Sequence, residues 1–159
     1  MRTALLILIG FIMVLTGCSV DQERHEIIDF INDSNNSAVM ERATKVEDDW
    51  NTIMSSDAQK YTRSQLIYEI GLLEQKASLS YKDMGEVVPP KCLRSFWDKE
   101  VEASKLSFQA MSLMYRMKDD PNITQDQVND LIFRASDLKT GALREFEDIC
   151  EKHNVKMPW

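Results

Sequence analysis

Glycine and proline are scarce in this chain of 159 residues, which contains five glycines and four prolines. Because both residues mark turns, their scarcity leaves long segments between a few interruptions. Gly85 with the Pro-Pro pair at 89–90 marks one turn, and the Asp/Pro/Asn cluster at 119–122 marks another. Between the turns, apolar residues recur three and four positions apart instead of alternating, which indicates helices and excludes strands and hairpins.

Histidine is also rare, because the chain has only His25 and His153. Nucleophilic catalysis needs a base held in a pocket beside a nucleophile, and neither histidine lies on a clear apolar face. We therefore expect both to be exposed and uninvolved. The sequence predicts no catalytic residue and no enzymatic activity.

Clustered positive charge is missing as well. The chain holds 19 basic and 26 acidic residues, a formal net charge of −7, and the acidic excess is spread along the sequence. Nucleic-acid binding needs grouped Lys and Arg, and docking on anionic lipid needs a polybasic segment. We therefore exclude nucleic acid as a partner and interpret the acidic residues as a solvated helix surface.

The N-terminal residues have the order of an export signal. Arg2 supplies a basic start, residues 4–14 are almost entirely apolar, and small residues precede Cys18. This order is typical of a cleaved signal peptide, and the apolar run is shorter than the roughly 20 residues of a membrane-spanning helix. We expect residues 1–17 to be the signal. Its removal takes away one basic residue and no acidic one, so the formal charge changes from −7 to −8.

The motif Leu15-Thr16-Gly17-Cys18 resembles the lipobox of bacterial lipoproteins. The resemblance implies that Cys18 receives a diacylglyceryl group, that cleavage precedes it, and that an acyl chain such as palmitate is often added to the new amino terminus. Ser19, where inner-membrane retention usually uses Asp, implies the outer membrane in a host that has one. Two or three acyl chains hold a protein durably on a bilayer. The alternative is a soluble exported protein with an incidental cysteine.

Residues 26–159 are predicted to fold as four helices, after a lipidated N-terminus and short tether at 18–25. The expected helices cover about 26–54, 58–84, 90–118 and 124–153, and Thr124 with Gln127 is a capping-box start for the last. Short connections predict an all-α, antiparallel up-down-up-down four-helix bundle.

The first helix has two interpretations, because the polar run at 32–37 favours turns. Either a tether precedes a shorter helix, or one long helix frays near Asn35. The apolar phase continues across the run, with Asn35 at a core-type position. Since the other helices each need a partner of similar length, we favour the long helix.

Cys92 and Cys150 are the two cysteines of the expected mature domain. Cys92 precedes Pro121 by 29 residues and Cys150 follows it by 29. Positions equidistant from the turn of an antiparallel hairpin are level with each other, and an exported compartment permits oxidation. We predict a disulfide between them, which would stabilise the hairpin by closing a long loop. The alternative is two small buried thiols.

The sequence has few residue spacings that are typical of metal-binding sites. Cys150-x-x-His153 has the spacing of half a metal site, but no second half accompanies it, and the Glu-x-x-His pairs of di-iron bundles are absent. Met111, Met114 and Met117 have a spacing found in thioether copper sites. The same methionines extend the apolar face of their helix, where methionine fills gaps in a core, and we favour that role.

An exported bundle with a histidine near the end of its last helix loosely resembles the b-type cytochromes of the four-helix class. The resemblance would pair His153 with Met40 or Met54 of the first helix. No other pattern supports such a pairing. We expect no cofactor, and the binding of haem or copper is kept as the alternative.

Trp159 follows Pro158 at the end of the sequence, and proline prevents continuation of a helix. Such an aromatic tail either docks on a partner or folds back on the bundle.

The sequence combines a predicted lipid anchor with long polar helical faces and no group of catalytic residues. We therefore expect a non-enzymatic, lipid-anchored envelope protein that binds a protein partner. It would be an assembly or pilot lipoprotein, or an exclusion factor. A ligand- or metal-binding bundle is the alternative.

Overall fold

The computed structural model describes residues 20–55 and 61–157, and every regular element in these ranges is helical. A helical segment at 20–32 is followed by α2 (Ser34–Met54), α3 (Arg63–Glu86), a 3₁₀ turn η2 (Lys91–Leu93), α4 (Arg94–Arg116) and α5 (Gln125–Lys152). The predicted all-helical class is therefore confirmed. Both Cys18 and Trp159 lie outside the described residues. No helix in the described ranges is both long enough and apolar enough to cross a bilayer.

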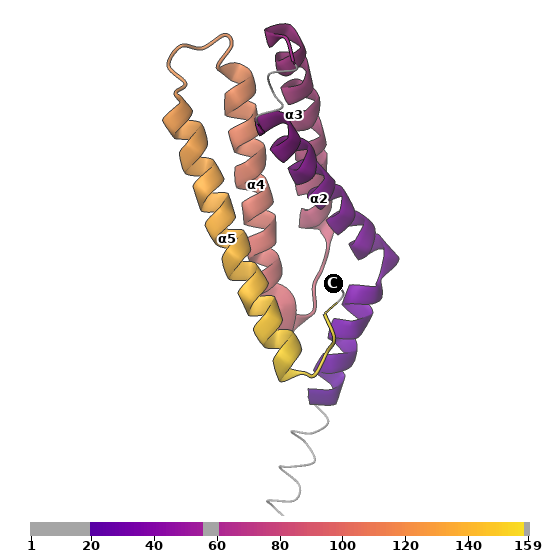
Figure 1. The fold of residues 1–159 in the computed structure, drawn as a ribbon. Helices are drawn as coiled ribbons and strands as arrows, with labels where there is room; N and C mark the ends of the chain where they lie inside the picture. Colours follow the sequence, from indigo (N-terminus) through magenta and orange to yellow (C-terminus); the bar gives the residue numbers. More distant parts are fainter. Residues whose placement is uncertain (1–19, 56–60, 158–159) are drawn as a thin grey trace, which may run out of the picture.

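Consecutive helices pack side by side in the order α2, α3, α4, α5 (Figure 1). Helix α4 is the most extensively packed, with α3 on one side and α5 on the other. Helix α2 packs on α3, and its direct contact with α5 is slight. Within the described residues, the α2–α5 side is therefore the open side of the molecule.

Most of the buried apolar side chains belong to two clusters. The first contains Ile27, Val39, Met84, Leu93, Phe96, Trp97, Ala142, Phe146 and Cys150. The second contains Val46, Ile53, Ile70, Leu73, Ala77 and Met111. Full burial of a large apolar side chain stabilises a fold by about 1.5–3 kcal/mol, so the clusters hold the helices together at two levels.

The chain bends between the 20–32 segment and α2, and Asp33 causes the break (Figure 1). Asp33 has an extended backbone, and its Oδ1 accepts hydrogen bonds from the backbone N–H of Asn35 (2.8 Å) and Asn36 (3.1 Å). This is an N-cap, which satisfies donors that lack partners within the helix. The prediction of one continuous helix over 26–54 is therefore wrong at this position, and Asn35 is exposed instead of facing the core.

The same polar run also caps the end of the preceding helical segment. Asn36 Nδ2 donates to the Phe30 carbonyl oxygen (3.1 Å), and Ser37 Oγ donates to that of Ile31 (3.4 Å). Terminal helix carbonyls need such partners. The run therefore caps two helix ends within a few residues. Apolar side chains on both sides of the bend, such as Ile27 and Val39, still pack in the first cluster.

The remaining helix ends follow local capping chemistry. Thr62 with Gln65 and Thr124 with Gln127 form capping boxes, and the second of these confirms the predicted start. Helix α3 begins later than the expected 58, and α4 covers less than the expected 90–118 because a 3₁₀ turn precedes it. Residues 20–25, expected in a tether, are helical.

The C-terminal residues turn back on the N-terminal segment after α5 ends. Asn154 has a left-handed backbone (φ 50°), with Asn154 N–H bonded to the Glu151 carbonyl (3.1 Å) and Val155 N–H to that of Cys150 (2.9 Å). This is a Schellman motif, and it directs residues 155–157 alongside the 20–32 segment (Figure 1).

The chain reversal buries His153. Its side chain is 1% exposed, and Nε2 lies 3.4 Å from Glu23 Oε2 on the 20–32 segment. The expectation that His153 is exposed is therefore wrong, because it assumed that the helix end faced solvent. Val155 and Met157 pack on the apolar cluster that contains Ile27, so the tail holds the N-terminal segment against the rest of the fold.

Replacing Asn154 by valine is expected to lower the free energy of unfolding by about 1–2 kcal/mol, because a β-branched residue is strained in a left-handed backbone. Asn154→Gly is the matched control and should be neutral or slightly stabilising, since glycine adopts this conformation freely. Chemical denaturation of both variants checks the prediction. Equal stabilities of the valine and glycine variants would contradict the described helix end.

Candidate binding groove

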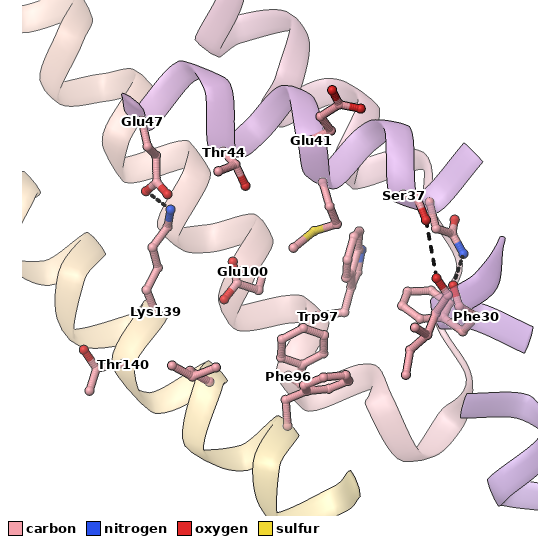
Figure 2. A pocket seen from close by; sticks show the side chains of 15 residues that line it. Phe30, Ser37, Glu41, Thr44, Glu47, Phe96, Trp97, Glu100, Lys139 and Thr140 are labelled. Atoms are coloured by element: carbon pink, nitrogen blue, oxygen red, sulfur yellow. Dashed lines mark hydrogen bonds and ion pairs between the residues drawn. The ribbon is translucent and has the colours of Figure 1, made fainter. Parts of the chain in front are cut away.

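A groove of about 600 Å³ opens between α2 and α5, and α4 forms its floor (Figure 2). Its lining consists of Phe30, Ile31, Asn36, Ser37, Met40, Glu41, Thr44, Glu47, Phe96, Trp97, Glu100, Lys139, Thr140, Leu143 and Phe146. The volume falls within the range of about 300–1,000 Å³ that is usual for ligand pockets. The groove is therefore the candidate functional site of the described residues.

Aromatic rings form an ordered apolar floor. The ring centroids of Phe96 and Phe146 lie 4.8 Å apart, and Phe30 contacts Trp97 edge-on at 5.4 Å. Trp97 is 2% exposed, and its Nε1 donates to the Met84 carbonyl oxygen (3.1 Å). Because the rings are packed on one another and the indole N–H is satisfied, this surface is preformed.

An ion pair between Glu47 of α2 and Lys139 of α5 crosses the groove (Figure 2). Beyond the pair lies a second hollow of about 280 Å³, which shares both residues and extends to Trp50 and Asn51. The two hollows are divided by the ion pair, and together they extend from Ser37 to Asn51, about 20 Å at 1.5 Å per residue along α2. The paired side chains are 27% (Lys139) and 40% (Glu47) exposed. Because the Lys139 side chain is largely buried, a bound chain that separates this pair has to give both side chains new polar partners.

Glu100 projects from α4 into the groove between its two walls (Figure 2). The residue is half-buried, and burial raises the pKa of its carboxyl to about 7. Burial causes this shift, and among the described residues Glu100 forms no ion pair. A carboxylate without such a partner, held at an apolar floor, is a destabilising feature that a cationic ligand would relieve.

Lys139 is the basic residue in the groove lining. Burial lowers the pKa of its ammonium group to about 8, and the ammonium group forms the ion pair with Glu47. Lys139 is therefore charged at neutral pH and paired with Glu47. With Glu41 and Glu100 also in the lining, the groove has an acidic excess.

The predicted cysteine pair lies at one end of the α4–α5 hairpin, with both thiols free. Cys92 lies in the 3₁₀ turn that packs on α5, Cys150 lies in the last turn of α5, and both belong to the same apolar cluster. Burial raises the pKa of both thiols, and at Cys92 the carboxylates of Glu23 and Glu26 add to the effect. Their disulfide stays a prediction.

The predicted export leads to a compartment that permits oxidation, so protein extracted from cells without reductant is expected to carry the Cys92–Cys150 bond. Alkylation under denaturing conditions, followed by mass spectrometry, should label neither cysteine before reduction and both after it. In the control variant Cys92→Ser, Cys150 should be labelled without reduction. Labelling of both cysteines in unreduced wild-type protein would contradict the prediction.

Neither histidine lines the groove. His25 is exposed on the 20–32 segment, as predicted, whereas His153 is buried beside Glu23. Within residues 20–55 and 61–157, no group of three or more His, Cys, Asp or Glu side chains is arranged to hold a metal ion.

The methionines divide between the core and the groove. Met111 is buried in the second apolar cluster and Met114 packs against it, which agrees with the core interpretation. Of the two methionines considered for haem, Met40 lines the groove, whereas Met54 is 46% exposed in the last turn of α2.

The charged groove residues were not identified from the sequence, although a signal for two of them was present. Glu100 lies three residues after Trp97, and Lys139 lies three before Ala142, and both of these apolar neighbours are buried. A charged residue at helical spacing from core positions faces the interior. Such positions are candidates for a binding site.

No family model, no curated protein and no solved structure matches this chain. Function is therefore inferred from the groove, its charges and the predicted anchor. Packing of the helices does not require such a groove, so the groove is the feature on which the functional argument depends.

Proposed function

We propose that the protein is a lipid-anchored, non-enzymatic binding protein of the cell envelope, and that its groove between α2 and α5 captures a segment of a partner protein. The observation that carries the proposal is the open groove, with a packed aromatic floor beneath it, between two helices that share little direct packing. Helices α2 to α5 are interpreted as an antiparallel up-down-up-down four-helix bundle that is open on this side. An assembly or pilot lipoprotein, or an exclusion factor, would need such a surface.

The position of the groove relative to the proposed anchor also supports this role. Phe30 and Ile31, at the end of the 20–32 segment, line the groove, and Cys18 lies two residues before the start of that segment. Eleven residues of helix span only about 17 Å. With acyl chains on Cys18, the groove would be held close to the bilayer, in the outer membrane of a diderm host as Ser19 favours.

Two leucine-to-arginine substitutions test the proposal. Leu143 lines the groove and is 44% exposed, whereas Leu79 is 63% exposed on α3 and does not line it. After reversible crosslinking in intact cells, Leu143→Arg should lose one specific crosslinked protein that wild type and Leu79→Arg retain. A crosslinking pattern that is the same in all three would contradict the proposal, provided that circular dichroism shows folded variants.

A groove of this volume also fits a small apolar ligand, and a ligand-binding bundle is the second candidate function. Under this alternative, protein purified from the envelope should contain a stoichiometric organic molecule, haem or copper. Native mass spectrometry and metal analysis measure this directly. A ligand that is lost in Leu143→Arg and retained in Leu79→Arg would favour this candidate over a protein partner.

A further inference from the structure

We propose that the occupant of the groove is an amphipathic helix of about four turns that carries a basic side chain opposite Glu100. This inference rests on the proposed function and names the chemistry of the partner. Three observations carry it: the length of the groove, its apolar floor and its unbalanced carboxylates.

The dimensions of the groove favour a helix. Its length of about 20 Å corresponds to about 14 helical residues. An amphipathic helix binds such a groove through apolar residues at positions i, i+3 or i+4, and i+7, and the half-buried Ile31 and Met40 with the exposed Leu143 provide the facing apolar surface. Since α2 and α5 share little direct packing, a helix between them would contact both.

The charges of the groove favour a basic occupant. Glu41 and Glu47 face it from α2 and Glu100 from the floor, and Lys139 on α5 is paired with Glu47. A Lys or Arg at the centre of the bound helix would give Glu100 the cation that the described residues do not supply. Anionic lipid headgroups would instead be repelled by the same carboxylates.

Binding of the basic helix should depend on the ionisation of Glu100. Burial holds the pKa of Glu100 at about 7, so the carboxyl is largely protonated at pH 6 and largely ionised at pH 8. Glu41 and Glu47 on α2 and Lys139 on α5 are the other charged groups that line the groove. We expect affinity for the basic helix to rise between pH 6 and pH 8, and Glu100→Gln to reduce this rise to the part that comes from Lys139, whose pKa of about 8 places its own deprotonation at the upper end of the range.

Fluorescently labelled synthetic helices test the inference. The full chain is placed in phosphatidylcholine nanodiscs and titrated with an amidated Leu/Ala/Gln helix of about four turns that has one central Lys. A second helix has Glu at that position, and empty nanodiscs correct for lipid binding. Fluorescence anisotropy at pH 8 should give about tenfold or greater weakening from the Lys helix to the Glu helix, because a buried charge pair is replaced by a repulsive one.

Matched variants locate the effect. Glu100→Gln should remove most of the preference for the Lys helix, whereas Asp98→Asn, which removes an exposed carboxylate from the same helix α4, should keep it. Leu143→Arg should abolish binding of the Lys helix, because it removes an exposed apolar contact and adds a cation to the groove. These three results together support the inference.

The contradicting results are equally distinct. Equal affinity for the Lys and Glu helices, or a Lys preference that survives in Glu100→Gln, would overturn the proposed pairing. Undiminished binding to Leu143→Arg would place the peptide outside the groove and overturn the inference. If neither peptide binds while Leu143→Arg still loses a crosslinked protein in cells, the helix chemistry is wrong and the proposed function stands. Loss of the crosslinking difference instead contradicts the proposed function.

Discussion

Replacing Cys18 by serine is expected to move the protein almost entirely from the membrane fraction to the soluble fraction of the envelope. Each buried methylene of an acyl chain contributes about 0.8 kcal/mol to membrane binding, so two or three chains dominate every other interaction with the bilayer. No helix within the described ranges offers a membrane span to replace them. Fractionation, together with incorporation of labelled palmitate, measures the change.

Cys92→Ser is the matched control for the anchoring prediction, because it removes a thiol that lies in the folded domain. This variant should remain in the membrane fraction and incorporate palmitate as wild type does. A Cys18→Ser protein that is processed alike and stays with the membrane would contradict the lipid anchor, and with it the envelope role.

Replacing Glu100 by glutamine is expected to stabilise the fold at pH 8 by about 1–3 kcal/mol, at 1.36 kcal/mol per pKa unit. Burial raises the pKa of Glu100 from 4.5 to about 7, so the folded state binds this proton more tightly than the unfolded chain does. The stability of the wild type therefore falls as pH rises from 4.5 to 7 and stays low above that range. Glutamine has no such titration, and the difference between the two proteins should vanish near pH 4.5.

Denaturation curves of wild type, Glu100→Gln and the exposed-site control Asp98→Asn, recorded from pH 4.5 to pH 8, measure this difference. The control should follow the wild type throughout. If Glu100→Gln gained no stability between pH 4.5 and pH 8, a compensating cation would have to accompany the wild-type carboxylate. The groove would then lack the unbalanced charge on which the choice of a basic partner depends.

The helical class could be predicted because its determinants are local. Apolar spacing and the Thr124–Gln127 capping box depend on residues within one or two turns of each other. The bend at Asp33 was missed because two local signals disagreed there. The apolar phase continued across residues 32–37, and the capping preference of Asp33 prevailed because its side chain satisfies two backbone donors.

The groove could not be predicted, because it depends on how far α2 stands from α5. That separation is a property of tertiary packing, and no pattern within one helix reports it. The burial of His153 was missed for a related reason. It depends on a chain reversal at Asn154 that places residues 155–157 against the 20–32 segment.

The C-terminal tail, the N-terminal segment and the groove form one connected arrangement. The tail packs on the 20–32 segment through Val155 and Met157, and the end of that segment contributes Phe30 and Ile31 to the groove.

Site-specific photocrosslinking in living cells tests most directly whether the groove is where a partner binds. Thr44 lines the groove from α2, whereas Thr52 lies on the same helix and lines a hollow against α3. With a photoreactive residue placed at one or the other position, irradiation should give a discrete protein adduct from Thr44 and none of that mass from Thr52. The same adduct from both positions, or adducts from Thr52 alone, would contradict a partner bound between α2 and α5.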